Sequence, residues 1–168
     1  MNWVLCGMMG CGKSTVGARL AQKVNRVFVD TDAIIVERYG KISDIFERYG
    51  EAYFRDLETE LVKELYQKEG QVLSLGGGLV LHEENVRLLK EQGKIIFLRA
   101  EKRTLVERLQ ADKNRPLLQN AQSLSSRVDE LLISRAPIYE RVSDMTVDVD
   151  DKSPEQIVDE IIKSIGQV

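Results

Sequence analysis

Short apolar runs alternate with segments of helical periodicity along the chain, and this alternation restricts the fold more than any other feature. The runs with the length of buried strands are residues 3–7, 27–30, 72–75, 95–98 and 145–149. Between them, apolar residues recur at helical spacing, as Leu57, Leu61 and Leu65 do, and Ser153 with Pro154 has the pattern of a helix start. Strands that alternate with amphipathic helices form parallel sheets covered by helices on both faces. The sequence therefore predicts an α/β fold built on a five-stranded parallel sheet.

The composition is that of one ordinary globular domain. The chain has 168 residues, of which 43% are apolar and 30% charged, and its three prolines mark no linker between two domains. Its net charge of -3 gives no general attraction for nucleic acid, although a local arginine cluster would still bind a small anion. No run approaches the length of a membrane span, and the N-terminus lacks a basic region followed by an apolar stretch. We therefore expect a cytoplasmic monomer with no nucleic-acid or membrane partner, acting on small acidic ligands.

The cysteines and the single histidine do not form a metal-binding pattern. Cys6 and Cys11 lie five residues apart without a C-x-x-C spacing, and His82 is the only histidine. Neither a thiolate metal site nor a disulfide framework is indicated. We expect Cys6 to be buried and His82 to open the helix that follows the glycines.

The segment GMMGCGKS, Gly7 to Ser14, fits the phosphate-loop pattern G-x-x-x-x-G-K-[S/T] at every fixed position. It follows the first predicted strand and opens a helix, where free backbone N–H groups and the positive helix end favour a phosphate chain. Lys13 is placed to reach the β and γ phosphates, and the Ser14 hydroxyl to ligate magnesium. The sequence therefore predicts a site for a nucleoside triphosphate with Mg²⁺.

A phosphate loop alone does not define an activity, because switches, motors and small-molecule kinases share it. A GTPase would be expected to carry the guanine-reading N-K-x-D, and the chain has only DKNR at 112–115, with the letters in another order. Motor ATPases usually carry an acid at the end of a strand where this chain has Ser74 and, after Leu75, the glycines. These absences favour a small-molecule kinase.

Two aspartates follow the second predicted strand. If the chain is extended there, Asp30 and Asp32 project to the same side at the carboxyl edge of the sheet, where parallel α/β sheets bind ligands. Asp30 would then hold the metal through water, and Asp32 would accept a hydrogen bond from an acceptor hydroxyl. The alternative is that one of the two aspartates, with Asp32 the candidate considered, only caps a helix starting near Ala33.

Three consecutive glycines and three arginines complete the candidate site. Glycines at the end of an apolar run indicate that something approaches the backbone closely, and here they are Gly76, Gly77 and Gly78. The arginines are Arg55, Arg115 and Arg135, and we expect the last two to precede turns or helix ends made by prolines. A single arginine is usually a solvated surface charge, but together these three form part of a recognisable pattern.

The chain resembles the shikimate kinases from Val4 to about Ile162. The matching segments are GMMGCGKST, VDTDAIIVERYGKISDIFERYGEAYFRDLE, LSLGGG, NRPLL and SRAPIYERV, in the family's order and spacing. The resemblance implies a single domain over residues 1–168, with the nucleoside-monophosphate-kinase-like strand order 2-3-1-4-5. It also implies ATP-dependent phosphorylation of the shikimate 3-hydroxyl, a step in aromatic amino-acid biosynthesis.

The resemblance assigns the acceptor site. It implies that Asp32 binds the ring hydroxyls and orients or deprotonates the attacking one, and that Arg55 and Arg135 hold the carboxylate through paired guanidinium donors. Gly77, flanked by Gly76 and Gly78, would present its backbone amide to a ring hydroxyl. The group that approaches the glycines would then be the substrate ring, bound by a segment of about residues 31–70 in which Phe46 and Phe54 are weaker candidates for ring contact.

The resemblance also assigns the nucleotide site. It implies that the phosphate-loop residues contacting ATP are Gly10, Cys11, Gly12, Lys13, Ser14 and Thr15. Arg108 and Pro154 would flank adenine, and Lys152 stands near a position that is often arginine in the family. The stretch of about 111–123 resembles the family's mobile lid, whose closure would bring Arg115 against the transferred phosphoryl group.

Two other functions remain open from the sequence. A related kinase could phosphorylate gluconate or a nucleoside monophosphate, but such an enzyme would not need arginines placed for a carboxylate beside three glycines. A nucleotide-binding module without catalysis would have no need of Asp32 and Arg115 beside the phosphate loop.

Overall fold

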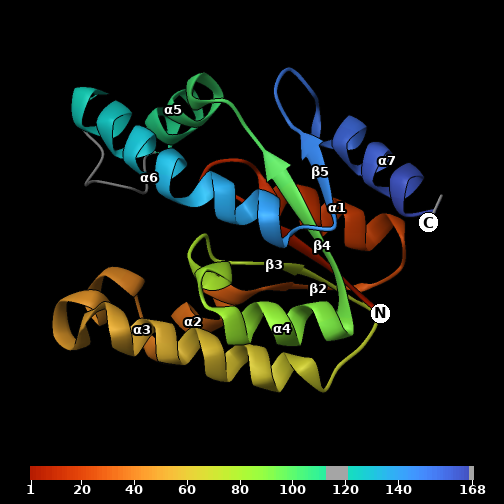
Figure 1. The fold of residues 1–168 in the computed structure, drawn as a ribbon, viewed down its shortest axis with the longest axis horizontal. Coiled ribbons are helices and arrows are strands. Elements are labelled where there is room, and N and C mark those ends of the chain that lie inside the picture. The colour runs from red at the N-terminus through yellow and green to blue at the C-terminus, as the bar shows by residue number, and fades with distance from the viewer. Residues whose placement is uncertain (113–120, 167–168) are drawn as a thin grey trace.

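The computed structural model describes residues 1–112 and 121–166, which fold around one five-stranded parallel sheet. The strands lie in the order β2-β3-β1-β4-β5, as Figure 1 shows, so the predicted order is confirmed. Each strand lies within two residues of the run that predicted it. Their bounds are β1 (Asn2–Cys6), β2 (Val27–Asp30), β3 (Gln71–Ser74), β4 (Gly93–Arg99) and β5 (Met145–Asp148).

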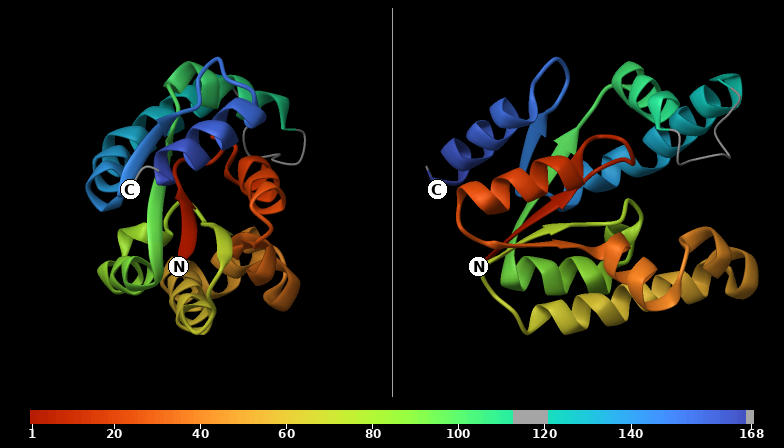
Figure 2. Two further views of the ribbon diagram at one scale, coloured as in Figure 1. Left: turned by 90° about the vertical axis from the view of Figure 1, so that its right-hand side faces the viewer. Right: turned by 180° about the vertical axis from the view of Figure 1, so that it is seen from behind.

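Helices cover both faces of the sheet. One layer contains α1 packed against α7, and the other contains α3, α4 and α6, with α5 beside α6 (Figure 2). The helix bounds are α1 (Lys13–Lys23), α2 (Thr31–Tyr39), α3 (Ile42–Tyr66), α4 (Glu83–Gln92), α5 (Lys102–Ala111), α6 (Ala121–Val142) and α7 (Pro154–Ile165), with a 3-10 turn η1 (Leu79–Leu81). This arrangement buries both faces of the sheet, which explains why its strands read as continuous apolar runs.

The central strands form the core. All five residues of β1 are buried, and Leu5, Ile95, Ile96 and Leu98 are almost completely inaccessible. The same strands end at the edge where the phosphate loop and the glycine turn begin. The site is therefore supported by the most deeply buried part of the molecule.

Two local predictions about the chain path were wrong. Asp32 does not continue a strand, because β2 ends at Asp30 and α2 begins at Thr31; the helix cap is Asp30, whose carboxylate accepts a hydrogen bond from the Ala33 amide at 3.1 Å. Pro137 does not end a helix after Arg135, because α6 continues to Val142. Pro137 is exposed, so water can solvate the backbone carbonyl that its missing N–H leaves without a donor.

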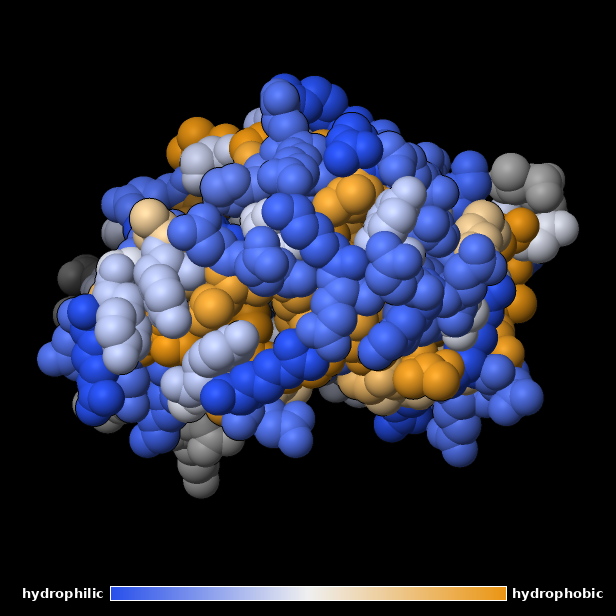
Figure 3. Space-filling model, turned by 90° about the horizontal axis from the view of Figure 1, so that it is seen from below, coloured by the Kyte–Doolittle hydropathy of each residue, from blue (hydrophilic) through white to orange (hydrophobic). Residues whose placement is uncertain are grey.

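No helix among residues 1–112 and 121–166 is long and apolar enough to cross a bilayer. Figure 3 shows the face that lies at the bottom of Figure 1, where α3 is found. This face carries mainly hydrophilic side chains with small apolar areas between them. Arg115 and most of the predicted lid lie outside the described residues.

Candidate active site

The phosphate loop connects β1 to α1 in the predicted position. Gly7, Gly10 and Gly12 have positive φ angles of 144°, 81° and 98°, which side-chain-bearing residues rarely adopt. Lys13 is buried, and its ammonium donates to the carbonyls of Gly7 at 2.8 Å and Met8 at 2.9 Å. The loop thus surrounds a cation at the amino end of a helix, a strongly anion-binding arrangement.

Ser14 and Asp30 lie together although sixteen residues separate them. Ser14 Oγ donates to Asp30 Oδ2 at 2.5 Å, and Ser74 Oγ is 3.5 Å from Ser14 Oγ. No group of three or more His, Cys, Asp or Glu side chains in the described part of the chain could hold a metal by itself. A hydroxyl and one carboxylate nevertheless fit Mg²⁺, which binds oxygen, keeps several waters and is completed by phosphate oxygens in kinases.

Arg108 reaches the phosphate loop from α5. Its Nη1 donates to the Cys11 carbonyl at 2.9 Å and lies 3.5 Å from the Gly10 carbonyl. Cys11 is fully buried, so only its backbone can face a ligand, whereas Thr15 on the first turn of α1 is exposed. Cys6 and Cys11 are both free and buried, and the predicted burial of Cys6 is confirmed.

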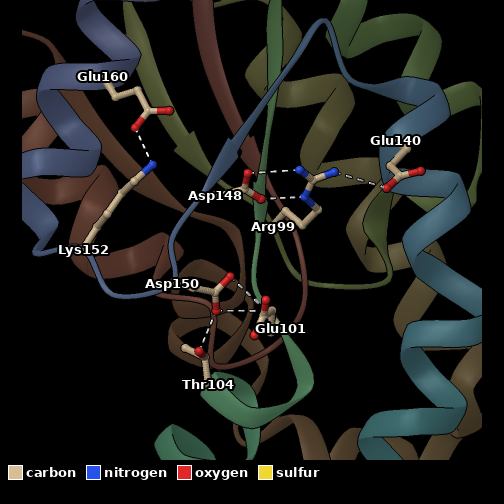
Figure 4. Close-up of polar contacts among 8 residues, drawn as sticks. All are labelled: Arg99, Glu101, Thr104, Glu140, Asp148, Asp150, Lys152 and Glu160. Atoms are coloured by element: carbon tan, nitrogen blue, oxygen red, sulfur yellow. Dashed lines mark hydrogen bonds and ion pairs between the residues drawn. The ribbon is translucent and has the colours of Figure 1, made fainter.

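The loop after β5 brings Lys152 and Pro154 to the same edge of the sheet. Pro154 is the first residue of α7, which begins with a complete capping box between Ser153 and Gln156. Lys152 Nζ is bonded to Glu160 Oε2 at 2.6 Å (Figure 4), so this side chain is held against α7. A role for Lys152 in binding ATP would require that ion pair to open.

The glycine turn after β3 lies beneath the predicted acceptor-binding side chains. A Cβ added at Gly76 would be 2.6 Å from Asp32 Oδ1, and one at Gly77 would be 3.2 Å from Arg135 Nη1. A Cβ at Gly78 would overlap the guanidinium of Arg55. The sequence predicted that a substrate ring approaches these glycines; the structure shows that protein side chains already do so.

Arg55 is held by two carboxylates of its own helix. Its Nη1 donates to Glu58 Oε2 at 2.7 Å and its Nη2 to Glu51 Oε1 at 3.1 Å. Glu58 is completely buried, and its other oxygen, Oε1, has no hydrogen-bond partner within the described residues. Burial raises the pKa of the Glu58 carboxyl, and the nearby charge of Asp32 acts in the same direction, while the bond to Arg55 opposes both.

Glu58 is a site residue that the sequence prediction missed. A glutamate is rarely buried, so its type alone does not indicate this position. The available signal was the spacing in RDLE, which places Glu58 one helical turn after Arg55.

Tyr139 is a second missed residue. It is fully buried on α6, four residues after Arg135, and its hydroxyl donates to the Gly77 carbonyl at 2.6 Å. Burial raises the pKa of the Tyr139 hydroxyl, which keeps the donor proton in place. One face of α6 therefore presents both Arg135 and Tyr139 to the glycine turn.

The aromatic residues of the predicted acceptor segment pack on one another. The rings of Phe46 and Phe54 have centroids 5.0 Å apart, and Phe54 is buried whereas Phe46 remains 36% exposed. The Arg55 guanidinium lies 5.3 Å from the Phe54 ring centre. The buried Phe54 ring thus lies next to the Arg55 guanidinium, and Phe46 has the more accessible ring.

The phosphate loop, the strand order and the charged residues at the carboxyl edge of the sheet define a P-loop kinase with the topology of the nucleoside monophosphate kinases. The family model described as shikimate kinase matches residues 9–166. A shikimate kinase of Thermodesulfovibrio yellowstonii is 44% identical over 96% of this chain and 93% of its own, and one of Haemophilus influenzae is 42% identical over 99% and 93%. The chain belongs to the shikimate kinase family.

Solved structures agree with this assignment. A shikimate kinase from Acinetobacter baumannii, in complex with shikimate, superposes with a TM-score of 0.91 at 35% identity, covering 99% of this chain and 93% of its own. One from Aquifex aeolicus gives 0.84 at 39% identity, with coverage of 99% and 96%. A gluconokinase from Sinorhizobium meliloti gives 0.65 at 19% identity over 99% and 91%, which shows a shared fold alone.

Proposed function

We propose that this protein transfers the γ-phosphoryl group of ATP to the 3-hydroxyl of shikimate, giving shikimate 3-phosphate and ADP. This is a step on the route to chorismate and the aromatic amino acids. The observation that carries the proposal is the grouping of Arg55, Arg135 and Asp32 over the glycine turn, beside the phosphate loop. Two cations and a carboxylate suit an acceptor that has both an acid group and hydroxyls. Membership of the shikimate kinase family supports this choice.

The acceptor is bound through its two kinds of polar group. Arg55 and Arg135 hold the carboxylate, because a guanidinium offers paired N–H donors that match its two oxygens. Asp32 accepts the hydrogen bond of the attacking hydroxyl, and the Gly77 amide contacts a second ring hydroxyl. Residues 31–70 form the acceptor segment of a single domain, with Gly76 and Gly78 leaving room for the charged side chains above them.

The nucleotide lies along the phosphate loop. The loop residues Gly10 to Thr15 hold the phosphates, with Lys13 neutralising charge on the β and γ groups. Arg108 and Pro154 flank the adenine, and Lys152 assists once it leaves Glu160. Residues 111–123 form a lid that brings Arg115 to the transferred group; eight of them, including Arg115, lie outside the described residues.

Mg²⁺ completes the site when it is bound. Ser14 would hold it directly and Asp30 through water, and the ion would supply positive charge beside the β and γ phosphates. The protein's own contribution is positioning: Lys13 fixes the donor, and Asp32 aligns the acceptor oxygen with the phosphorus and takes up or orients its proton. We further propose that the protein works as a cytoplasmic monomer that binds neither nucleic acid nor membranes.

The test is a coupled assay of ADP release with ATP and Mg²⁺, run with shikimate, quinate, gluconate, AMP, CMP or no acceptor. Release that depends on shikimate alone supports the proposal. Release with gluconate or a nucleotide instead would keep the phosphate loop assignment and refute the acceptor site. ATP binding without release for any acceptor would indicate a noncatalytic nucleotide-binding module.

A matched pair of arginine variants tests the carboxylate assignment. Arg135→Ala should raise the KM for shikimate while leaving the KM for ATP nearly unchanged. The control is Arg127→Ala, on the same helix, because Arg127 is exposed and pairs only weakly with Glu130 at 3.4 Å. Equal shikimate KM values for the two variants would show that Arg135 does not bind the carboxylate.

A further inference from the structure

Asp150, in the loop between β5 and α7, is bonded to the start of α5. Its carboxylate accepts hydrogen bonds from the Glu101 amide, at 3.0 Å and 3.2 Å to the two oxygens, and from the Thr104 hydroxyl at 2.5 Å (Figure 4). Forty-nine residues separate Asp150 from Glu101 along the chain. The contact therefore joins two segments that the sequence keeps apart.

The start of α5 has no side-chain cap of its own among the described residues. Glu101 occupies the cap position, yet its side chain accepts no capping bond from the described residues, and the first turn of α5 contains no acidic residue. Free N–H groups and the positive helix end favour an anion there. Asp150 places a carboxylate at this end of α5 from another segment of the chain, bonded to the Glu101 amide and the Thr104 hydroxyl.

The opposite end of α5 touches the phosphate loop. Thr104 and Arg108 are four residues apart, so they lie on the same side of the helix one turn from each other. Thr104 is bonded to Asp150, and Arg108 donates to the Cys11 carbonyl at 2.9 Å. One side of α5 thus connects the β5–α7 loop to the phosphate loop.

We propose that Asp150 is a positioning residue for the nucleotide, acting through α5 on Arg108. The loop that carries Asp150 leads into Pro154, the first residue of α7, so the bonds to Glu101 and Thr104 bear on the spacing between the two residues proposed to flank the adenine. Asp150 itself need not touch ATP. This inference rests on the nucleotide site described under the proposed function.

A neighbouring ion pair provides a matched control. Asp148 lies two residues before Asp150 and pairs with Arg99 through bonds of 2.6 Å and 3.0 Å. Arg99 also lies 3.8 Å from Glu140 on α6. Asp148→Ala therefore removes one carboxylate and its charge from the same edge without touching the bonds to Glu101 and Thr104.

The first experiment measures the dissociation constant of ATP and the KM for each substrate in Asp150→Ala, Asp150→Asn and Asp148→Ala. Asp150→Ala should weaken ATP binding about fivefold, equivalent to about 1 kcal/mol, with the KM for shikimate unchanged. Asp150→Asn keeps an acceptor oxygen but loses the charge, so it should recover part of the affinity, and Asp148→Ala should behave as wild type. Equal ATP affinity in Asp150→Ala and Asp148→Ala would overturn the inference.

A double-mutant cycle separates positioning from general destabilisation. If Asp150 acts through Arg108, then adding Asp150→Ala to Arg108→Ala should cause no further loss of ATP affinity. Fully additive losses would overturn the inference. If Asp150→Ala does not fold, Thr104→Val replaces it. This substitution keeps the side-chain shape and removes the hydrogen bond from the Thr104 hydroxyl to Asp150, on the side of α5 that carries Arg108. Unchanged ATP affinity in Thr104→Val would then overturn the inference.

The outcome also distinguishes this inference from the proposed function. A wild-type protein that binds no ATP would refute both together. A wild-type protein that phosphorylates shikimate while Asp150→Ala retains full ATP affinity would refute only the role of Asp150.

Discussion

The buried ion pair between Glu58 and Arg55 leads to a prediction about folding stability. We compare Glu58→Ala, which removes the partner of a guanidinium that is only 11% exposed, with Glu58→Gln, which keeps the side-chain shape and an acceptor oxygen. Breaking a buried pair typically costs about 3–5 kcal/mol, and the remaining exposed partner Glu51 recovers about 0–1 kcal/mol. The free energy of unfolding of Glu58→Ala should therefore fall by about 3 kcal/mol.

Glu58→Gln should cost much less. The amide loses the charge assistance of the bond to Arg55, which is worth about 1 kcal/mol, but it also avoids burying a charge whose second oxygen has no partner among the described residues. The two effects nearly cancel, so we expect a change within about 1 kcal/mol of zero. With about 2–4 °C of Tm per kcal/mol in a chain of this size, the alanine variant should melt about 6–12 °C lower and the glutamine variant within a few degrees of wild type.

The pH dependence gives an independent check. Burial raises the folded-state pKa of Glu58 above the ordinary value of 4.5 for a glutamate, so between these two values the folded protein binds more protons than the unfolded chain. Stability from this group is present below pH 4.5 and is lost as the pH rises through the folded-state pKa. Relative to wild type, Glu58→Gln should therefore gain stability with rising pH across that window.

The assay is urea unfolding followed by circular dichroism, at a series of pH values from 4.5 to 7.5 for the three proteins. A glutamine variant as unstable as the alanine variant would show that the charge itself holds Arg55. A difference between wild type and Glu58→Gln that does not vary with pH would show that the Glu58 pKa is not raised.

Three further substitutions test separate contacts. Lys13→Met should reduce kcat by about 10²–10³ with shikimate binding intact, as steady-state kinetics and calorimetric titration would show, because one cation at the transferred phosphoryl group is lost; retained turnover would exclude that role. Gly78→Ala should displace the Arg55 guanidinium and weaken shikimate binding by at least about tenfold while ATP binding stays constant, measured by titration with each ligand. Tyr139→Phe should leave the Gly77 carbonyl without its 2.6 Å donor and lower the free energy of unfolding by about 1–2 kcal/mol in urea, and an unchanged midpoint would contradict the importance of this bond.

Local sequence patterns predicted the sheet and the phosphate loop well. Apolar runs identify buried strands regardless of what surrounds them. The motif from Gly7 to Ser14 identifies the phosphate loop because the loop needs glycine where the backbone adopts positive φ angles, as it does at Gly7, Gly10 and Gly12. The strand order came from the family resemblance and is confirmed. These features depend on residues that are close in sequence or on a motif of fixed spacing.

Features that depend on packing were predicted less well. Asp30 and Asp32 were expected on one extended segment, but the decision between strand and helix there rests on a capping bond to Ala33, and the spacing of the aspartates does not determine it. The burial of Glu58 and Tyr139 depends on how α3 and α6 meet the glycine turn. Pro137 is tolerated within α6 because it is exposed to solvent, and the sequence alone does not show that a proline will be exposed.

The pairing of β1 with β3 has a consequence for how donor and acceptor are brought together. The two strands are hydrogen-bonded neighbours, with Leu5 opposite Ser74, and the phosphate loop follows one while the glycine turn follows the other. Parallel neighbours are about 4.8 Å apart, a separation set by backbone geometry and independent of the side chains. With the two substrates bound as proposed, the lateral offset between them is set by the backbone of the sheet. A change of acceptor specificity could then arise in residues 31–70 and α6 without altering the distance over which the phosphoryl group must travel.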